Sequence, residues 1–201
     1  IVATIDDEIK ESVNEKIVNL NQTDKGQGHI IPGFDMILDK GLGYLIEKVN
    51  EKAEKNDFYK AAKITLEAAS NHILRYANLA DELLETEKDE VRRKDLERIS
   101  VISRKISYEK PESFLEALQL LWYMCVILQH ESNASSISLG RIDQYFNKFY
   151  ENDIKKSVPQ KELKEFLEAF YIKTNDIVMI RSSHSAKFFA GFPVGYTALL
   201  G

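Results

Sequence analysis

Residues 111–129 carry the strongest structural signal and read PESFLEALQLLWYMCVILQ. Pro111 suits the first turn of a helix, where its missing N–H costs nothing. The helix that follows, Phe114 to Gln129, is apolar nearly all round, and such a helix lies inside a large assembly of elements. We expect 201 residues to be too few to surround it. Its segment Leu120 to Leu128 should therefore expose apolar surface in this chain alone.

Three amphipathic helices are predicted before this buried one. The first follows Pro32-Gly33, and Gly41 and Gly43 should weaken or break it. The second is capped by Asn56-Asp57, and the third takes roughly residues 88–106. We expect all three to be outer helices with one solvated face.

Short strands and helices are predicted after the buried helix. Residues 131–140 indicate a loop or a short strand, and helices should follow at Gln144 to Tyr150 and after Pro159. Ile177 to Ile180 is typical of a buried strand, and the apolar end Tyr196 to Gly201 reads like the entry to another. The predicted order is many helices first and then short strands with helices between them. This order is typical of the start of an α/β fold whose sheet lies mainly downstream.

Composition excludes several classes of protein. The net charge is -5 and no dense Lys/Arg stripe is present, which argues against a nucleic-acid partner. Cys125 is the only cysteine, so an internal disulfide and a Cys-rich zinc site are ruled out. Its mid-helix position indicates a core residue, and we expect a cytoplasmic chain. The longest apolar run is far shorter than the roughly 20 residues that span a bilayer, so no membrane contact is expected.

His29 is the histidine that the residues alone single out. It follows Gly28 and is anchored by Ile30 and Ile31, so it could bind a substrate hydroxyl or simply brace a loop. The hydroxyl-rich residues 132–138 leave the same choice between contact with a polar substrate and plain loop hydrogen bonding. The residues alone assemble no nucleophile, metal set or acid–base pair.

Three segments together resemble the glycyl radical enzymes. The first contains GHIIPGF, residues 28–34. The second runs from PESFLEALQLLW at residue 111 through ESN at 131 to GRIDQY at 140–145. The third begins with IKTND at residues 172–176. The family includes pyruvate formate-lyase, glycerol and propanediol dehydratases, choline lyase and hydroxyproline dehydratase.

The resemblance implies a fold and a mechanism. The family fold is a ten-stranded α/β barrel wrapped in helices, so residues 1–201 should form a mainly α part of a single pyruvate formate-lyase-like domain, truncated at both ends. That part would hold outer helices and the first barrel strands. In the family, a stored glycyl radical makes a thiyl radical on a barrel-centre cysteine, which takes a hydrogen atom from the substrate. A separate radical S-adenosylmethionine activase installs the glycyl radical.

The resemblance also places the reactive groups outside this chain. The catalytic cysteine and the radical glycine have no match here and are expected beyond Gly201, and Cys125 does not fill that role. We therefore expect the chain alone to be inactive and to bind no cofactor or metal. The full-length protein should be a homodimer that meets an activating enzyme and a small-molecule substrate.

Substrate contacts are implied residue by residue. His29 matches a histidine that contacts a substrate hydroxyl in dehydratase-type members, and Ser136 matches a polar substrate-facing residue, with Ser135 one register away. Phe192 is the candidate for an aromatic residue that lines the pocket, and the GRIDQY motif supplies structural parts of the barrel entry.

Three functions remain open at this point. The resemblance favours a radical dehydratase or lyase that acts on a small hydroxylated substrate of the glycerol or diol type. The alternatives are formate C-acetyltransferase activity, as in pyruvate formate-lyase, and a non-catalytic remnant or scaffold piece.

Overall fold

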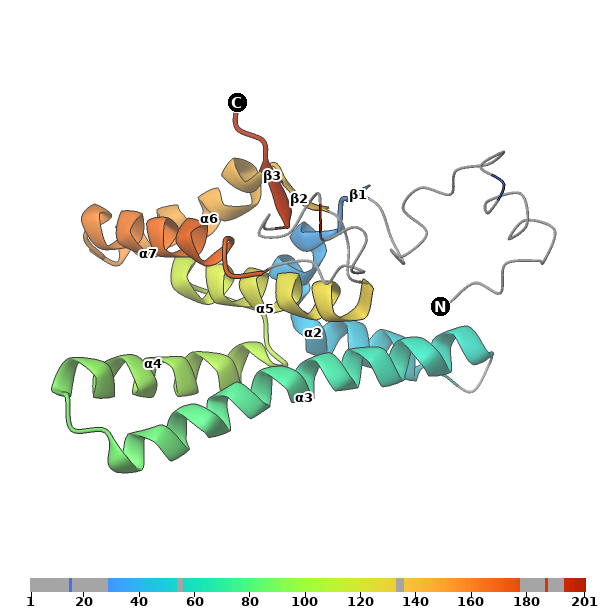
Figure 1. Ribbon diagram of the computed structural model, residues 1–201, viewed down its shortest axis with the longest axis horizontal. Helices are drawn as coiled ribbons and strands as arrows, with labels where there is room; N and C mark the ends of the chain where they lie inside the picture. The colour runs from blue at the N-terminus through green and yellow to red at the C-terminus, as the bar shows by residue number, and fades with distance from the viewer. Residues whose placement is uncertain (1–14, 16–28, 54–55, 133–135, 178–186, 188–193) are drawn as a thin grey trace.

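The computed structural model describes residue 15, residues 29–53, 56–132 and 136–177, residue 187 and residues 194–201. In these parts the chain is mainly helical, with a small parallel sheet, as expected for outer helices and the first strands of an α/β fold (Figure 1). The elements in order are β1 (His29–Ile30), α2 (Phe34–Asn50), α3 (Asp57–Thr86), α4 (Glu90–Ile106), α5 (Phe114–Ser132), β2 (Ser136–Gly140), α6 (Ile142–Lys155), α7 (Gln160–Lys173) and β3 (Gly195–Ala198).

Helix α5 is the centre of the packing. It contacts α2, α3, α4, α6 and α7, and in Figure 1 it lies between the long α3–α4 pair and the layer of α6 and α7. Leu120, Leu121 and Cys125 are at most 1% exposed. The expectation that 201 residues could not surround this helix is therefore wrong for most of its circumference, because five helices of this chain already cover it.

One stripe of α5 stays only half-buried. It consists of residues spaced four, three and four positions apart, which lie on one face of a helix: Leu115, Gln119, Trp122 and Val126. Of the segment Leu120 to Leu128 predicted to expose apolar surface, Trp122 and Val126 of this stripe are half-buried, and so are Ile127 and Leu128.

Asp153 fixes the start of α5 from the end of α6. The backbone N–H of Phe114 donates to Asp153 Oδ2 over 2.8 Å, and Asp153 is 5% exposed. The side chain of Asn152 donates to the carbonyl of Glu112 over 2.8 Å. The first N–H groups of a helix have no partner within the helix, so the bond to Asp153 satisfies an N–H that burial would otherwise leave unpaired.

The two glycines expected to break the first helix have a specific role. Gly41 has φ 78 and ψ 165, which kinks α2, and a Cβ there would lie 2.6 Å from the backbone nitrogen of Lys110. The N–H of Gly43 donates to the carbonyl of Tyr108 over 2.7 Å. Both positions thus allow the segment between α4 and α5 to pass directly against α2.

Helices α3 and α4 form the long antiparallel pair at the bottom of Figure 1. Asn56 caps α3 by accepting from the N–H of Tyr59 over 3.1 Å, and Asp89 caps α4 by accepting from the N–H of Arg92 over 2.8 Å. These bonds confirm the predicted cap at residues 56–57 and the predicted helix near 88–106.

The three strands form one parallel sheet in the order β1-β2-β3. Of the loop or short strand expected within residues 131–140, the strand is observed as β2, and the strand entry expected at the end of the chain is observed as β3. Of the predicted strand Ile177 to Ile180, residues 178–180 lie outside the described residues. Parallel strands that are not consecutive in sequence need long crossovers, which α2 to α5 supply between β1 and β2.

Candidate functional site

One face of the sheet belongs to the hydrophobic core. Ile137 and Leu139 of β2 are 0% and 2% exposed and share a cluster with residues of α5 and α6. Tyr196 and Ala198 of β3 pack against the same cluster. The helices therefore cover this face of the sheet, as they do in helix-wrapped α/β folds.

The opposite face of the sheet is small and polar. Side chains alternate along a strand, so the residues between the buried ones lie on the other side. In β2 these are Ser136 and Ser138, both half-buried, and in β3 they are Gly195 and Thr197, both exposed. A strand buried on both faces is usually apolar throughout, so this polar face indicates contact with something polar.

The sheet brings two of the residues predicted to contact substrate into register. His29 of β1 and Ser136 of β2 are Cα partners, and Ser136 is also the Cα partner of Gly195. Ser136 therefore occupies the middle strand of the candidate site. Ser135 and Phe192, the other two candidates, lie outside the described residues.

A β-bulge follows directly on the polar face. Ser138 pairs with Thr197 and Gly140 pairs with Ala198, so two residues of β2 oppose one of β3. Gly140 adopts φ 70, a conformation that favours glycine. Bulges bend a strand and re-aim its side chains, and they are frequent next to active sites.

Hydrogen bonds hold this bulge in place. The hydroxyl of Tyr145 donates to the carbonyl of Leu139 over 2.7 Å, and the N–H of Leu199 donates to the carbonyl of Gly140 over 2.9 Å. Burial raises the pKa of Tyr145, so its hydroxyl keeps the proton that it donates.

Arg141 and Asp143 brace the start of α6, in keeping with the structural role that the motif implied. The guanidinium Nε and Nη2 donate to the two carboxylate oxygens over 2.9 and 2.7 Å, and Nη2 also donates to the carbonyl of Gly201. The Arg141 guanidinium lowers the pKa of Asp143 to about 2. The pair thus stays charged and ties Gly201, three residues after β3, to the start of α6.

Cys125 is buried and a poor nucleophile in this fold. It is fully buried in α5, and burial raises the pKa of its thiol to about 12. Because the thiolate is the reactive form of cysteine, this residue acts as a small core side chain, as expected.

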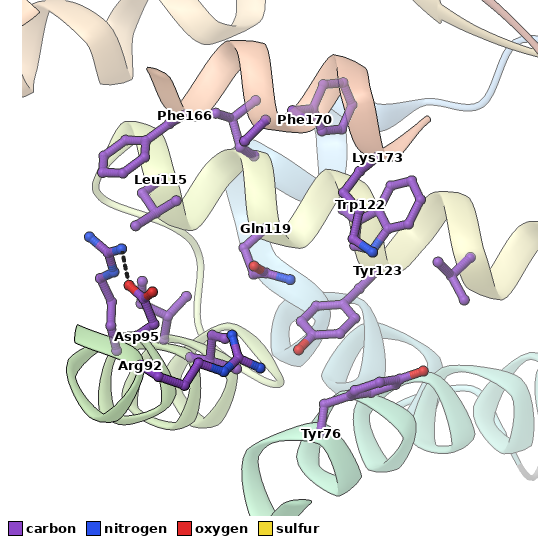
Figure 2. A pocket seen from close by; sticks show the side chains of 16 residues that line it. Tyr76, Arg92, Asp95, Leu115, Gln119, Trp122, Tyr123, Phe166, Phe170 and Lys173 are labelled. Carbon is purple, nitrogen blue, oxygen red and sulfur yellow. Dashed lines mark hydrogen bonds and ion pairs between the residues drawn. The ribbon is translucent and has the colours of Figure 1, made fainter. Parts of the chain in front are cut away.

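A groove of about 570 Å³ lies apart from the sheet, between α3, α4, α5 and α7. Figure 2 shows Gln119 and Trp122 of the α5 stripe along it, with Tyr76 and Tyr123 at one end. Its basic side chains are Arg92, Arg98 and Lys173, and Asp95 accepts from Arg98 over 2.9 Å. The residues that line the groove include no member of the sheet, so its volume does not mark the candidate site.

The described residues hold neither a metal-binding cluster nor a membrane-spanning helix. In that part of the chain no three His, Cys, Asp or Glu side chains are grouped so that they could hold a metal ion. Nor does any helix there have the length and apolar character needed to cross a bilayer.

A parallel sheet with helices over one face and hydroxyl-bearing residues on the other defines the described part of the chain as a piece of an α/β fold with a candidate polar site. The family model described as "Pyruvate formate lyase-like" matches residues 1–201. The chain belongs to the pyruvate formate lyase-like family.

Two curated relatives show how much of a family member this chain spans. It is 36% identical over 138 residues to "Probable dehydratase YbiW" of Escherichia coli (strain K12), covering 68% of this chain and 17% of that protein. It is 38% identical over 112 residues to (2S)-3-sulfopropanediol dehydratase of Klebsiella oxytoca, covering 55% of this chain and 14% of that enzyme. The relatives are glycyl radical dehydratases and lyases, so the family is catalytic.

A solved structure shows the same arrangement of elements. The chain superimposes on the glycerol-bound B12-independent glycerol dehydratase from Clostridium butyricum with a TM-score of 0.87 and 33% sequence identity. The superposition covers 99% of this chain and 27% of that one. The predicted glycyl radical enzyme fold is thereby confirmed at the level of its helices and small parallel sheet.

Proposed function

We propose that this chain is the N-terminal-half part of a longer glycyl radical enzyme that dehydrates a small hydroxylated substrate of the glycerol or diol type. The observation that supports it most directly is the register of His29 with Ser136, on a sheet whose other face is filled by helices. The names of the relatives, which include a sulfopropanediol dehydratase and a glycerol dehydratase, support the same reaction class.

In this proposal His29 and Ser136 act on neighbouring hydroxyl groups of one substrate. An imidazole can accept the proton of the hydroxyl at the carbon that reacts, and a serine hydroxyl can hold the hydroxyl that leaves. The Cα positions of register partners on adjacent strands lie roughly 5 Å apart, a spacing that suits two oxygens on adjacent carbons. Phe192 would line the same pocket and exclude water.

The longer protein would supply what this chain lacks. A glycyl radical, installed by a radical S-adenosylmethionine activase, supplies the hydrogen-atom chemistry. The radical glycine and the catalytic cysteine would lie beyond Gly201, since Cys125 is enclosed in the hydrophobic core, away from the polar face of the sheet. We further propose that residues 1–201 contribute to a single domain, a ten-stranded barrel, in a cytoplasmic homodimer that works in anaerobic metabolism, and that this chain alone is inactive.

Assay of the full-length protein tests the reaction class. It would be activated anaerobically, its glycyl radical counted by electron paramagnetic resonance, and its products from glycerol, 1,2-propanediol and pyruvate measured. The expected result is dehydration of a diol or triol to an aldehyde, with no formate from pyruvate. Formate from pyruvate without diol turnover would replace this proposal with formate C-acetyltransferase activity. A radical-free, inactive protein would instead favour the non-catalytic alternative.

A further inference from the structure

Two hydroxyl-bearing residues on the polar face have no role in the proposed dehydration. Ser138 of β2 and Thr197 of β3 are Cα partners, and Ser138 lies two positions after Ser136 on the same face of the strand. Along a strand this spacing is roughly 7 Å, while neighbouring strands lie roughly 5 Å apart. Ser136, Ser138 and Thr197 therefore form a continuous row of three hydroxyl-bearing positions.

The neighbours of Ser138 and Thr197 do not engage their hydroxyl groups. Each is flanked along its strand by residues that belong to the core or pack against it, among them Ile137, Leu139 and Tyr196. Ser138 is half-buried and Thr197 is exposed. Within the described part of the chain, neither side chain makes a hydrogen bond to another residue. Both hydroxyls are therefore available to a ligand that approaches the polar face of the sheet, and a ligand that displaces their water must replace those hydrogen bonds.

The bulge gives independent support, because it begins immediately after this pair. It inserts an extra residue at Leu139–Gly140 and is held by the hydrogen bonds from Tyr145 and Leu199. Because hydrogen bonds fix the bulge, they also fix the direction of β2 at the position where Ser138 pairs with Thr197. The pair is thus presented in a fixed geometry, which specific recognition of a hydroxyl group requires.

We propose that Ser138 and Thr197 bind a further hydroxyl of the substrate, beyond the two that react, and so make the site selective for triols over diols. This inference rests on the proposed function. Ser138 and Thr197 are specificity-determining residues in it, and they take no part in proton transfer. A site built to hydrogen-bond a hydroxyl discriminates against the analogue that lacks it, because the protein groups are then left unpaired.

The test compares glycerol with 1,2-propanediol, which lacks the third hydroxyl, in the activated full-length enzyme. Ser138→Ala and Thr197→Val each remove a hydroxyl, and valine suits a strand, so Thr197→Val should keep the fold. We expect kcat/KM for glycerol to fall about tenfold in the double variant, with kcat/KM for propanediol changed less than about twofold, as the loss of one or two hydrogen bonds predicts. Thr197→Ser should restore most of the glycerol value.

One control variant and the wild-type enzyme separate this inference from the function on which it rests. Thr65→Val removes an exposed hydroxyl on α3 that bonds only to the carbonyl of Ala61, and it should leave both substrates unaffected. Equal losses for both substrates, or no loss for either, in an otherwise active enzyme would overturn the selectivity role alone. If the wild-type enzyme dehydrates neither substrate, the proposed function and this inference fall together.

Discussion

His29 and Ser136 sit side by side in register on neighbouring parallel strands, although the whole helical run from α2 to α5 separates them in sequence. Helices fill one face of the sheet, and Ser136 lies on the other, polar face. A pairing of this kind is specified by the fold and not by local sequence, because strand register depends on which face is buried. It is the structural basis of the proposed dehydration.

The buried cap of α5 predicts a specific loss of stability. Asp153→Ala should leave the N–H of Phe114 buried without its acceptor and lower the free energy of unfolding by about 2 kcal/mol. Asp89→Ala removes an exposed cap of α4 and should cost about 1 kcal/mol. Urea denaturation of the two variants measures the difference. Equal costs would mean that the Asp153 contact contributes no more than an exposed cap.

The sequence predicts the helices better than their packing. Helix α5 is recognisable because apolar residues surround it, and the caps at Asn56 and Asp89 are local signals. The bond from Phe114 to Asp153 joins residues 39 apart, and no local pattern reveals it. The expectation that 201 residues would be too few to surround α5 was wrong for most of the helix for the same reason, since burial depends on how distant helices fold back.

The candidate site was predicted in part. The family resemblance singled out His29 and Ser136, but their register follows only from the sheet. Thr197 was missed, because the end of the chain reads only as the entry to a strand. The pattern that could have revealed Thr197 is the alternation of exposed and core-facing residues within Gly195–Ala198. This alternation identifies the polar face only when β3 is known to pair with β2.

Two glycines with positive φ should differ sharply in their tolerance of a side chain. Gly41→Ala would bring a Cβ to within 2.6 Å of the backbone nitrogen of Lys110, so it combines backbone strain with a clash. We expect it to destabilise the chain by roughly 3 kcal/mol or more. Gly140→Ala meets no atom within 4 Å and should cost only about 1 kcal/mol of strain. Thermal or urea unfolding of both variants measures these costs. Equal losses of unfolding free energy would contradict the close approach at Gly41.

The buried thiol predicts a pH dependence of stability. The folded state raises the pKa of Cys125 from its ordinary value of 9.0 to about 12. Between those values the unfolded chain has lost a proton that the folded chain keeps, so stability falls as pH rises, by at most about 1.4 kcal/mol per pH unit. Below pH 9.0 the thiol is protonated in both states, so its contribution to stability does not change with pH.

Cys125→Ala should make the unfolding free energy fall less steeply with pH. Tyrosines that titrate in the same range affect wild type and variant alike, so the difference between the two isolates the thiol. Unfolding free energies measured from pH 8 to pH 10.5, roughly the window that the raised pKa defines, test this. In parallel, a thiol reagent should label wild-type Cys125 only in denaturant, because the residue is fully buried. Rapid labelling of the folded chain would contradict the burial of this thiol.

The half-buried stripe of α5 predicts binding of an anionic apolar dye. The groove combines apolar side chains with Arg92, Arg98 and Lys173, and it contains Trp122, the only tryptophan of the chain. A naphthalene sulfonate dye should bind there, quench tryptophan fluorescence and compete with self-association of the chain.

Trp122→Ala should weaken dye binding several-fold, since an aromatic wall of the groove is lost. Tyr44→Ala removes an exposed aromatic ring of α2 outside the groove and should have no effect. Titration of dye fluorescence with each variant measures this, and a chain that binds no dye and stays monomeric at high concentration would refute the expectation of exposed apolar surface.

The central claim is that His29 binds the substrate hydroxyl and that Ser136 assists it. The most direct test is turnover per glycyl radical in the activated full-length enzyme, for wild type, His29→Ala, Ser136→Ala and the control Thr65→Ala. We predict a loss of roughly two to four orders of magnitude for His29→Ala, as removal of a proton acceptor implies. Ser136→Ala should lose roughly five- to tenfold, as for one hydrogen bond, while radical content and the control stay at wild-type levels. Full diol turnover by His29→Ala would contradict the account and leave His29 as a loop brace.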